Sequence, residues 1–494
     1  YADPAHEKAT LAELRKLWPE VSAVSSHQIT REWREYERTN TAVLSAYVQP
    51  IAERYLARLK DGLAERGFAG SPYIMQSNCG VDSLEAVSQI PITMVESGPA
   101  SGFWGAAELG KLIGEPNILA LDIGGTTAKC SLIEDGQVRI MTDYWIERDR
   151  TFAGYPIMVP VVDLVEIGNG GGSIAWVDDF GKLHVGPQSA GAMPGPAAYG
   201  RGGTLPTVTD ANIVLGRLDP ANFLGGAMAL DAGAAREAVQ RFATEVGLGL
   251  DQAALGILTI VNANMANAIR SRTVQKGIDP RGFALVAFGG AGPLHAVEVA
   301  QALAIREVLV PPYPGITSAM GLLTTDLRYD AVRTCFQVSG ALDPARIAAD
   351  FAAMEATIAA QFAADGIDRA DVSFARAADL RYVGQGYELR VAVDPGETTQ
   401  AMLDAAIARF HDRHRAEYGH AFTQSPIEIV NLRVTGTGAR PKLGRPSPPR
   451  AGSIDGALIR RGPVVFAGPA GPQTRDTAFL ARDRLPLDTA VAGP

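Results

Sequence analysis

An apolar run that ends in a glycine-rich turn constrains this chain more than any other feature. Residues 119–123 are apolar except for Asp122, and the turn Gly124-Gly125-Thr126-Thr127 follows directly. Such a run predicts a buried strand that delivers the turn to the edge of a sheet. Paired glycines let backbone N–H groups approach an anion without a Cβ in the way, and threonine hydroxyls can donate to phosphate oxygens. Because Asp122 can hold a magnesium-bound water, the run predicts a nucleotide-phosphate site.

The alternative is a tight turn between two strands, whose glycines only supply positive φ angles. An aspartate at the end of the strand and two threonines after the glycines favour phosphate binding over that alternative. The turn is not a P-loop, because the chain contains no G-x-x-x-x-G-K-[ST] motif.

A second glycine motif follows another apolar run. Residues 283–288 predict a buried strand, and Gly289, Gly290 and Gly292 come next, before a helix expected over 294–303. A strand, a glycine turn and a helix N-terminus together form an edge that can face a nucleotide, although an ordinary strand-to-helix turn is an equal alternative. His295 is expected to be packed or hydrogen-bonded, with a catalytic role as the lesser alternative.

Two further motifs are candidates for the same site. The run Gly170-Gly171-Gly172-Ser173 needs a reason, since each glycine costs chain entropy on folding. Close approach of a ligand and a flexible hinge are equal alternatives for it. The segment 206–212 predicts a helix start capped by Thr209 or Asp210, and a metal-binding or general-base role for Asp210 is the sharper alternative.

Three other features favour structural roles. The small residues of 97–102 suit tight packing of a helix, and 380–389 predicts an amphipathic strand with a glycine bulge, with a subunit interface or substrate channel as its alternative. His411 and His414 share one face of a helix. A solvated face is favoured there over a metal site, because no acidic third ligand is obvious.

Composition and charge exclude several classes of partner. The 494 residues carry a net charge of −9 without a basic stripe, so nucleic acid and anionic membranes are poor partners. No apolar run reaches the roughly 18 residues that a spanning helix needs. The three cysteines are far apart without metal-site spacing, which favours a reducing, cytoplasmic location.

The chain is too long for one core, so two to four domains are expected. Helices are predicted over 8–18, 31–66, 99–112, 233–246, 251–274, 294–303, 343–365 and 398–418. Strands or hairpins are predicted over 74–76, 117–123, 131–140, 173–186, 283–288, 306–310, 373–393 and 427–437. Residues 187–209 are expected to form a long loop, and 438–452 a linker.

As a set, these motifs resemble the hydantoinase A/5-oxoprolinase family, which includes ATP-dependent N-methylhydantoinase A subunits and acetone and acetophenone carboxylase subunits. The resemblance covers nearly the whole chain in one order. The matching stretches are 35–41, 97–100, 122–127, 170–175, 185–192, 206–212 and 288–295.

The resemblance implies an α/β fold of the actin, sugar-kinase and chaperone ATPase type, with ribonuclease H-like lobes and a C-terminal α/β domain. The expected domains are 1–115, the remainder of the first lobe with a helical insertion; 116–333, the second lobe; and 334–494, the C-terminal domain. No first phosphate loop occurs before residue 74, so the chain is expected to be truncated at both ends or to have that half elsewhere.

The resemblance also implies a set of site residues. Asp122, Asp210 and His295 are the candidate catalytic residues, and Asp122 is the candidate magnesium ligand. The candidate nucleotide-binding residues are Gly124, Gly125, Thr126, Thr127, Gly171, Gly172, Ser173, Gly289, Gly290 and Gly292. Lys129 stands where many relatives have an acidic residue, so no carboxylate role is expected there.

The implied chemistry is ATP-dependent ring opening of a cyclic amide of hydantoin or 5-oxoproline type. ATP with Mg²⁺ would phosphorylate the amide oxygen, and water would attack on a hydantoinase B-type subunit or fused domain that carries its own metal. Two alternatives remain: a ketone carboxylase subunit of acetone or acetophenone type, and a non-catalytic ATP-binding scaffold.

Overall fold

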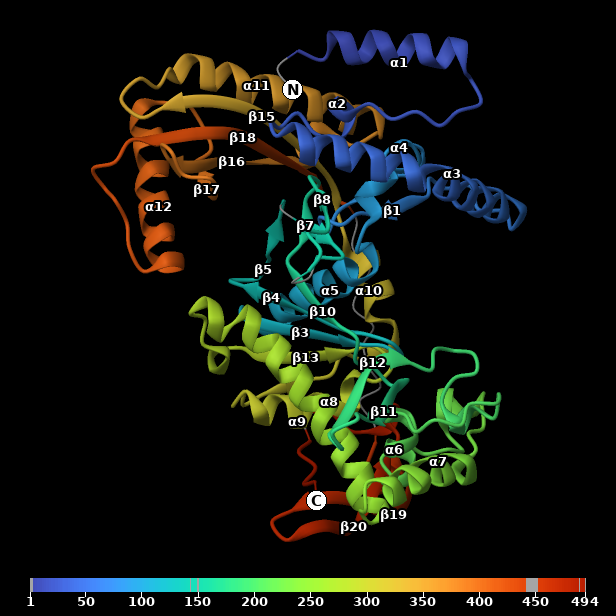
Figure 1. The fold of residues 1–494 in the computed structure, drawn as a ribbon. Coiled ribbons are helices and arrows are strands. Elements are labelled where there is room, and N and C mark those ends of the chain that lie inside the picture. The colour runs from blue at the N-terminus through green and yellow to red at the C-terminus, as the bar shows by residue number, and fades with distance from the viewer. Residues whose placement is uncertain (1–2, 143, 149–150, 441–451, 488, 494) are drawn as a thin grey trace. The chain divides into compact units, whose positions relative to one another are not determined.

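Two compact units, each assembled from three separate stretches of chain, make up this computed structural model (Figure 1). The structure describes residues 3–142, 144–148, 151–440, 452–487 and 489–493. Unit 1 contains the described residues of Tyr1–Glu108, Gln137–Asp163 and Ser318–Lys442, and unit 2 those of Leu109–Gly136, Leu164–Thr317 and Leu443–Pro494. The three-domain division expected from the sequence stays a prediction.

The sheet of unit 2 has a mixed parallel and antiparallel order. Its strands run in the order β10 (Leu164–Ile167), β4 (Ala128–Glu134), β3 (Ile118–Ile123), β13 (Ala284–Phe288) and β14 (Val308–Leu309). β4 is antiparallel to both of its neighbours, whereas β3, β13 and β14 are parallel. This is the strand order of a ribonuclease H-like sheet. Every residue of β3 and β13 is buried except Asp122, as expected for strands covered on both faces.

Helices and two hairpins complete unit 2. Helix α8 contacts β4 and β10, and α9 contacts β3 and β13 (Figure 1). The helices are α6 (Val208–Val214), α7 (Ala232–Glu245), α8 (Leu250–Arg272), α9 (Gly292–Ala302) and the short α13 (Ile454–Ala457). The hairpins are β11 (Ser173–Val177) with β12 (Leu183–Ser189), and β19 (Leu458–Gly468) with β20 (Gly471–Leu480). Val465 of β19 joins the apolar core of α8 and the sheet, so residues close to the C-terminus belong to this unit.

Unit 1 is built on a six-stranded, mainly antiparallel sheet. Its order is β1 (Tyr73–Met75), β2 (Val81–Ser83), β15 (Leu327–Val338), β18 (Ile427–Gly438), β16 (Val372–Tyr382) and β17 (Leu389–Val393). Helix α11 (Pro344–Ala364) packs on β15 and β18, and α12 (Gln400–Tyr418) packs on β17. A Cβ on Gly436 would collide with Ile358 and Phe362 of α11, so glycine allows the helix to lie close to the sheet.

The N-terminal half of unit 1 is mostly helical. Its helices are α1 (Ala5–Leu17), α2 (Ser26–Ile29), α3 (Glu35–Glu65), α4 (Leu84–Gln89) and α5 (Ser97–Ile113). The backbone carbonyl of Ser101 lies where a Cβ on Gly321 of α10 (Thr317–Thr324) would be, so the small residues of α5 do serve close helix packing. Two small ribbons pair β6 (Ile140–Met141) with β9 (Val161–Val162), and β7 (Tyr144–Ile146) with β8 (Tyr155–Ile157).

The predicted long helices and buried strands are confirmed to within a few residues, as is the α/β class. The sequence interpretation missed β15 and the β19–β20 hairpin. The predicted linker 438–452 falls largely on residues 441–451, which lie outside the described residues. In the described chain no single helix is both long and apolar enough to cross a membrane; one sharply bent pair, Ala232–Glu245 with Leu250–Lys276, passes by length and composition.

Candidate functional site

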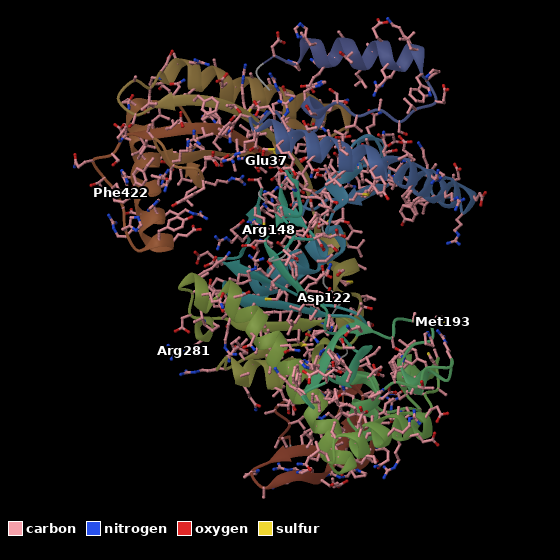
Figure 2. The ribbon with its side chains drawn as sticks, viewed as in Figure 1. Glu37, Asp122, Arg148, Met193, Arg281 and Phe422 are labelled. Carbon is pink, nitrogen blue, oxygen red and sulfur yellow. The ribbon has the colours of Figure 1, made fainter. Side chains whose placement is uncertain are left out.

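The ends of the parallel strands β3 and β13 define the candidate site in unit 2. Asp122 and Phe288 are register partners there, and the Ala291 N–H donates to the Ile123 carbonyl at 2.9 Å. Gly289 has φ +81°, and a Cβ on it would collide with the Asp122 carboxylate and the Ile123 carbonyl. The second glycine turn therefore crosses directly over Asp122, the second-last residue of β3, whose position Figure 2 labels.

Asp122 is a partly desolvated carboxylate beside a cation. Burial raises the pKa of Asp122 above its usual value, and the Lys129 ammonium opposes that shift. Lys129 is the register partner of Asp122 on β4, and its Nζ lies 3.5 Å from Glu166 on β10. The sequence interpretation gave Lys129 no role, although pairing 117–123 with the following strand could have placed it opposite Asp122.

The donor set suits one kind of metal site. Among the described residues no three His, Cys, Asp or Glu side chains gather in a metal-binding group. Mg²⁺ commonly takes one or two protein carboxylates and completes its shell with water and substrate phosphates. Asp122 fits that pattern, because it is a single, partly exposed carboxylate next to the exposed middle of the Gly124–Thr127 turn.

The third glycine motif packs on the first. The N–H of Gly171 donates to the Gly124 carbonyl at 3.0 Å, and the N–H of Gly172 to the Gly125 carbonyl at 2.6 Å. A Cβ on Gly170 would lie 2.7 Å from the Gly124 carbonyl oxygen. The glycine run thus allows one loop backbone to approach another. This close packing explains the glycines, and neither of the two explanations expected from the sequence, approach of a ligand or a flexible hinge, is needed.

The helix start at 206–212 joins the same group of loops. Thr209 donates from both its N–H and its Oγ1 to the Gly171 carbonyl, at 2.8 and 2.7 Å. Asp210 is fully buried, and its carboxylate accepts from Thr207 Oγ1 at 2.7 Å and from the N–H groups of Thr207, Ala197 and Ala198. Thr207, rather than Thr209 or Asp210, is the N-cap of α6, with Asp210 as the other half of a capping box. Burial raises the pKa of Asp210 against these hydrogen bonds.

The part of the site that is open to a ligand consists of backbone groups and side-chain hydroxyl groups. Gly125 and Thr126 are exposed, and no other atom lies within 4 Å of the place where a Cβ on Gly125 or Gly290 would be. Thr126 Oγ1 lies 3.3 Å from Ser189 Oγ, whereas Ser173 is buried and its Oγ accepts from the Gly170 N–H. The exposed edge therefore presents N–H and O–H donors, which suits an anion.

His295 faces inward. It is 1% exposed, its Nδ1 lies 2.8 Å from Asn262 Oδ1, and burial lowers its pKa to about 4. The structure thus brings together all the loops that the sequence singled out, but Asp210 and His295 lie below the exposed edge. The buried partners of His295 on α8 and α9 carried no recognisable motif.

The histidines of α12 belong to unit 1. His414 is fully buried, with Nδ1 2.7 Å from the His420 carbonyl and Nε2 3.1 Å from Gln385 Nε2. The expectation of a solvated helix face was wrong for His414, because the loop after α12 folds back over it.

A model of the hydantoinase/oxoprolinase family matches residues 38–331, which is more than half of the chain. The chain belongs to this family. The resemblance stated from the motifs is therefore confirmed.

Individual relatives of this hydantoinase/oxoprolinase chain have different substrates in their names. It is 33% identical over its whole length to caprolactamase subunit alpha of Pseudomonas jessenii, covering 70% of that protein. It is also 33% identical over 87% of its length to the acetophenone carboxylase gamma subunit of Aromatoleum aromaticum, covering 59% of it. The crystal structure of ATP-dependent caprolactamase from Pseudomonas jessenii matches with a TM-score of 0.82 and 32% identity, over 96% of this chain and 68% of that one.

The chain spans between 59% and 70% of the length of three curated relatives that it matches, the two subunits above among them. The likeness to caprolactamase confirms the predicted fold class, with its ribonuclease H-like lobe in unit 2.

Proposed function

We propose that this chain is the ATP-binding subunit of an enzyme that opens a cyclic amide by ATP-dependent hydrolysis. The observation that carries the proposal is the convergence of four loops, from 122–127, 170–173, 206–212 and 288–292, at the ends of β3 and β13 in unit 2. The names of the relatives, caprolactamase and the oxoprolinases of the family, supply the substrate class.

Each loop takes a part in this proposal. In the Gly124–Thr127 turn, which the Gly124 N–H closes by donating to the Thr127 carbonyl, the N–H groups of Gly125 and Thr126 and the threonine hydroxyls bind the phosphates. Gly289, Gly290 and Gly292 face the adenosine. Asp122 holds Mg²⁺, which when bound neutralises charge on the phosphates. Gly171, Gly172 and Ser173 support the phosphate turn from behind. Asp210 and His295, which are buried beneath the exposed edge, hold the loops in position.

The chemistry turns a poor electrophile into a good one. The amide oxygen attacks the γ-phosphorus and ADP leaves, so the ring carbon now carries a phosphate. Water adds to that carbon and the C–N bond breaks, with a proton going to the ring nitrogen. A second water releases phosphate from the resulting acyl phosphate. Alignment and charge neutralisation by the chain are sufficient for the first step, because phosphoryl transfer needs little covalent help.

The later water-dependent steps are assigned to a partner, a hydantoinase B-type subunit or fused domain with its own metal. Relatives named as subunits of caprolactamase and of carboxylases support an assembly of several subunits. A small cyclic amide as substrate, absence of nucleic acid and membrane partners, and a cytoplasmic location complete the proposal.

A second candidate is a subunit of a ketone carboxylase, in which an enolate oxygen takes the phosphoryl group. This candidate is supported by sequence identity, because the chain is 33% identical both to the caprolactamase subunit and to the acetophenone carboxylase subunit. A non-catalytic ATP-binding scaffold is the third.

The test is ATP hydrolysis by the chain in its complex with the partner subunit, with 5-oxoproline, hydantoins, caprolactam, or aryl ketones plus bicarbonate. We expect a cyclic amide to stimulate release of ADP and phosphate in step with ring opening. Stimulation only by ketone with bicarbonate supports the carboxylase. ATP binding without turnover on any of these compounds supports the scaffold, and no ATP binding at all contradicts all three.

A further inference from the structure

Four polar side chains, of which Asn262 and His295 are buried and Arg217 and Glu298 partly exposed, form one continuous relay in unit 2. Arg217 Nη1 lies 2.8 Å from Glu298 Oε1, and the other oxygen of Glu298 accepts a hydrogen bond from Asn262 Nδ2. Asn262 Oδ1 lies 2.8 Å from His295 Nδ1. Arg217 follows α6, Asn262 lies on α8, and Glu298 and His295 lie on α9. The relay therefore connects α8 and the segment after α6 to α9, the helix that follows the Gly289–Gly292 turn.

The order of donors and acceptors along the relay is fixed. A carboxylate only accepts hydrogen bonds, so Glu298 must accept one from Nδ2 of Asn262. The Oδ1 atom of Asn262 therefore faces His295. His295 Nδ1 must then carry the proton, a tautomer assigned from the hydrogen-bond network. Its Nε2 is buried and has no hydrogen-bond partner in the described chain, so the ring stays neutral. A single arrangement of all four side chains satisfies these constraints.

The relay ends one helical turn from the glycine loop. His295 is the fourth residue of α9, and the residue before that helix, Ala291, is held by its N–H bond to the Ile123 carbonyl. The N–H of Gly289 is held in the same way by the Pro314 carbonyl at 2.9 Å. A rotation or slide of α9 would move both bonds and thus the backbone that crosses Asp122.

We infer that Arg217, Glu298, Asn262 and His295 are positioning residues that hold the first turn of α9, and with it the Gly289–Gly292 loop, in the geometry that binds nucleotide. The inference rests on the proposed function for its ligand, but not for the ordering of the loop. A satisfied polar relay specifies one arrangement of α8, α9 and the segment after α6, whereas an apolar contact of the same size would tolerate a slide.

The variants separate the links of the relay. Asn262→Leu removes both hydrogen bonds of Asn262, to Glu298 and to His295, and His295→Leu removes only the second of these. His295→Asn keeps a donor at the position of Nδ1, so it is the conservative variant. Arg460→Gln is the matched control, because it removes an arginine–carboxylate pair of the same unit, to Asp219 at 2.9 Å, that lies outside the relay.

The first measurement is hydrogen exchange of the Gly289 and Ala291 amides in the full chain without nucleotide. We expect faster exchange in Asn262→Leu and His295→Leu, and wild-type exchange in His295→Asn and Arg460→Gln. The second is the ATP dissociation constant by calorimetry with Mg²⁺, which we expect to rise about tenfold in the two leucine variants and to recover in His295→Asn. In the assembled enzyme the KM for ATP should rise while kcat is retained.

The outcomes distinguish the relay from the site. Unchanged exchange at both amides in Asn262→Leu overturns the inference whatever the ATP affinity. Faster exchange with unchanged ATP affinity overturns the link from loop to nucleotide. If the wild-type chain binds no ATP, the proposed function fails, and the exchange data alone decide whether the relay orders the loop.

Discussion

At the scale of single residues, Asp122 carries the largest share of the proposed site. Its carboxylate lies against Gly289 of the second glycine turn, and the Lys129 cation on the neighbouring strand compensates part of its burial. Because burial already disfavours its charge, the carboxylate is held there at a cost to folding that a purely structural residue would not need.

Asp122→Asn should therefore abolish function without unfolding the chain. We expect ATP turnover in the assembled enzyme to fall by about 100-fold or more, since a positioned charge is removed, while the melting temperature stays level or rises. Turnover and thermal unfolding should be measured on the same sample. Asp219→Asn is the control, as that carboxylate pairs with Arg460 away from the loops and its pKa is lowered by that hydrogen bond. Wild-type turnover in Asp122→Asn would refute the phosphate site.

His295 makes a prediction about pH. Its pKa falls from 6.5 to about 4 on folding because burial disfavours the charged ring, with the Arg217 charge adding to the effect. Between these values the unfolded chain binds a proton that the folded chain does not, so stability is lost as the pH falls. At pH 5 the loss relative to pH 7 is about 2 kcal/mol.

That loss should disappear in His295→Asn. The free energy of unfolding, measured with urea at pH 7 and pH 5, should drop by about 2 kcal/mol more for the wild type than for the variant. Other titrating groups are common to both proteins and cancel in the difference. Parallel pH dependences would mean that His295 is protonated in the folded chain.

At the scale of elements, two neighbouring glycines of one loop have different constraints. Gly289 has φ +81° and no room for a Cβ, whereas no atom lies within 4 Å of a Cβ placed on Gly290. Gly289→Ala should lower the free energy of unfolding by about 1–3 kcal/mol, through strain and the collision with Asp122. Gly290→Ala should stay within about 0.5 kcal/mol of the wild type.

The two variants also test the ligand. If the Gly290 backbone faces adenosine, Gly290→Ala weakens ATP binding in a calorimetric titration although the fold is intact. Equal stability of both variants would contradict the crossing of the two loops. Unchanged ATP affinity in Gly290→Ala would remove that glycine from the nucleotide site.

The elements that the sequence predicted are those specified locally. Strands β3 and β13 are unbroken apolar runs, and α8 repeats its buried residues at helical spacing. β15 was missed because it carries Arg328, Asp330 and Arg333, and charged residues at this density are typical of a loop. Their partners come from distant elements: Thr435 of β18 hydrogen-bonds to Asp330, and Asp350 of α11 pairs with Arg333. The glycine loops could be predicted for the same local reason, whereas the relay behind His295 joins α8, α9 and the segment after α6 and has no local signal.

At the scale of the whole molecule, each unit depends on segments that are distant in the sequence. In unit 1 the buried Arg433 of β18 pairs with Glu32 near the start of the chain at 2.9 Å, and with Asp379 of β16 at 2.7 Å. Burial raises the pKa of Asp379, but the charges of Arg433 and Arg390 outweigh it and hold the pKa at about 2. The charged cluster thus joins the first residues of the unit to its last strands.

Arg433→Met should cost unit 1 about 3–5 kcal/mol, since the buried Glu32 loses its ion-pair partner and Asp379 keeps only Arg390. Trp18, Trp33, Trp104 and Trp145 belong to unit 1 and only Trp176 to unit 2, so tryptophan fluorescence in urea reports mainly on unit 1. Arg409→Met is the control, because its pair with Asp394 is exposed and should contribute about 1 kcal/mol or less. If the missing cation is the cause, adding Glu32→Met, which removes the carboxylate left without its ion pair, should restore part of the loss. A double variant as unstable as Arg433→Met would assign the effect to packing instead.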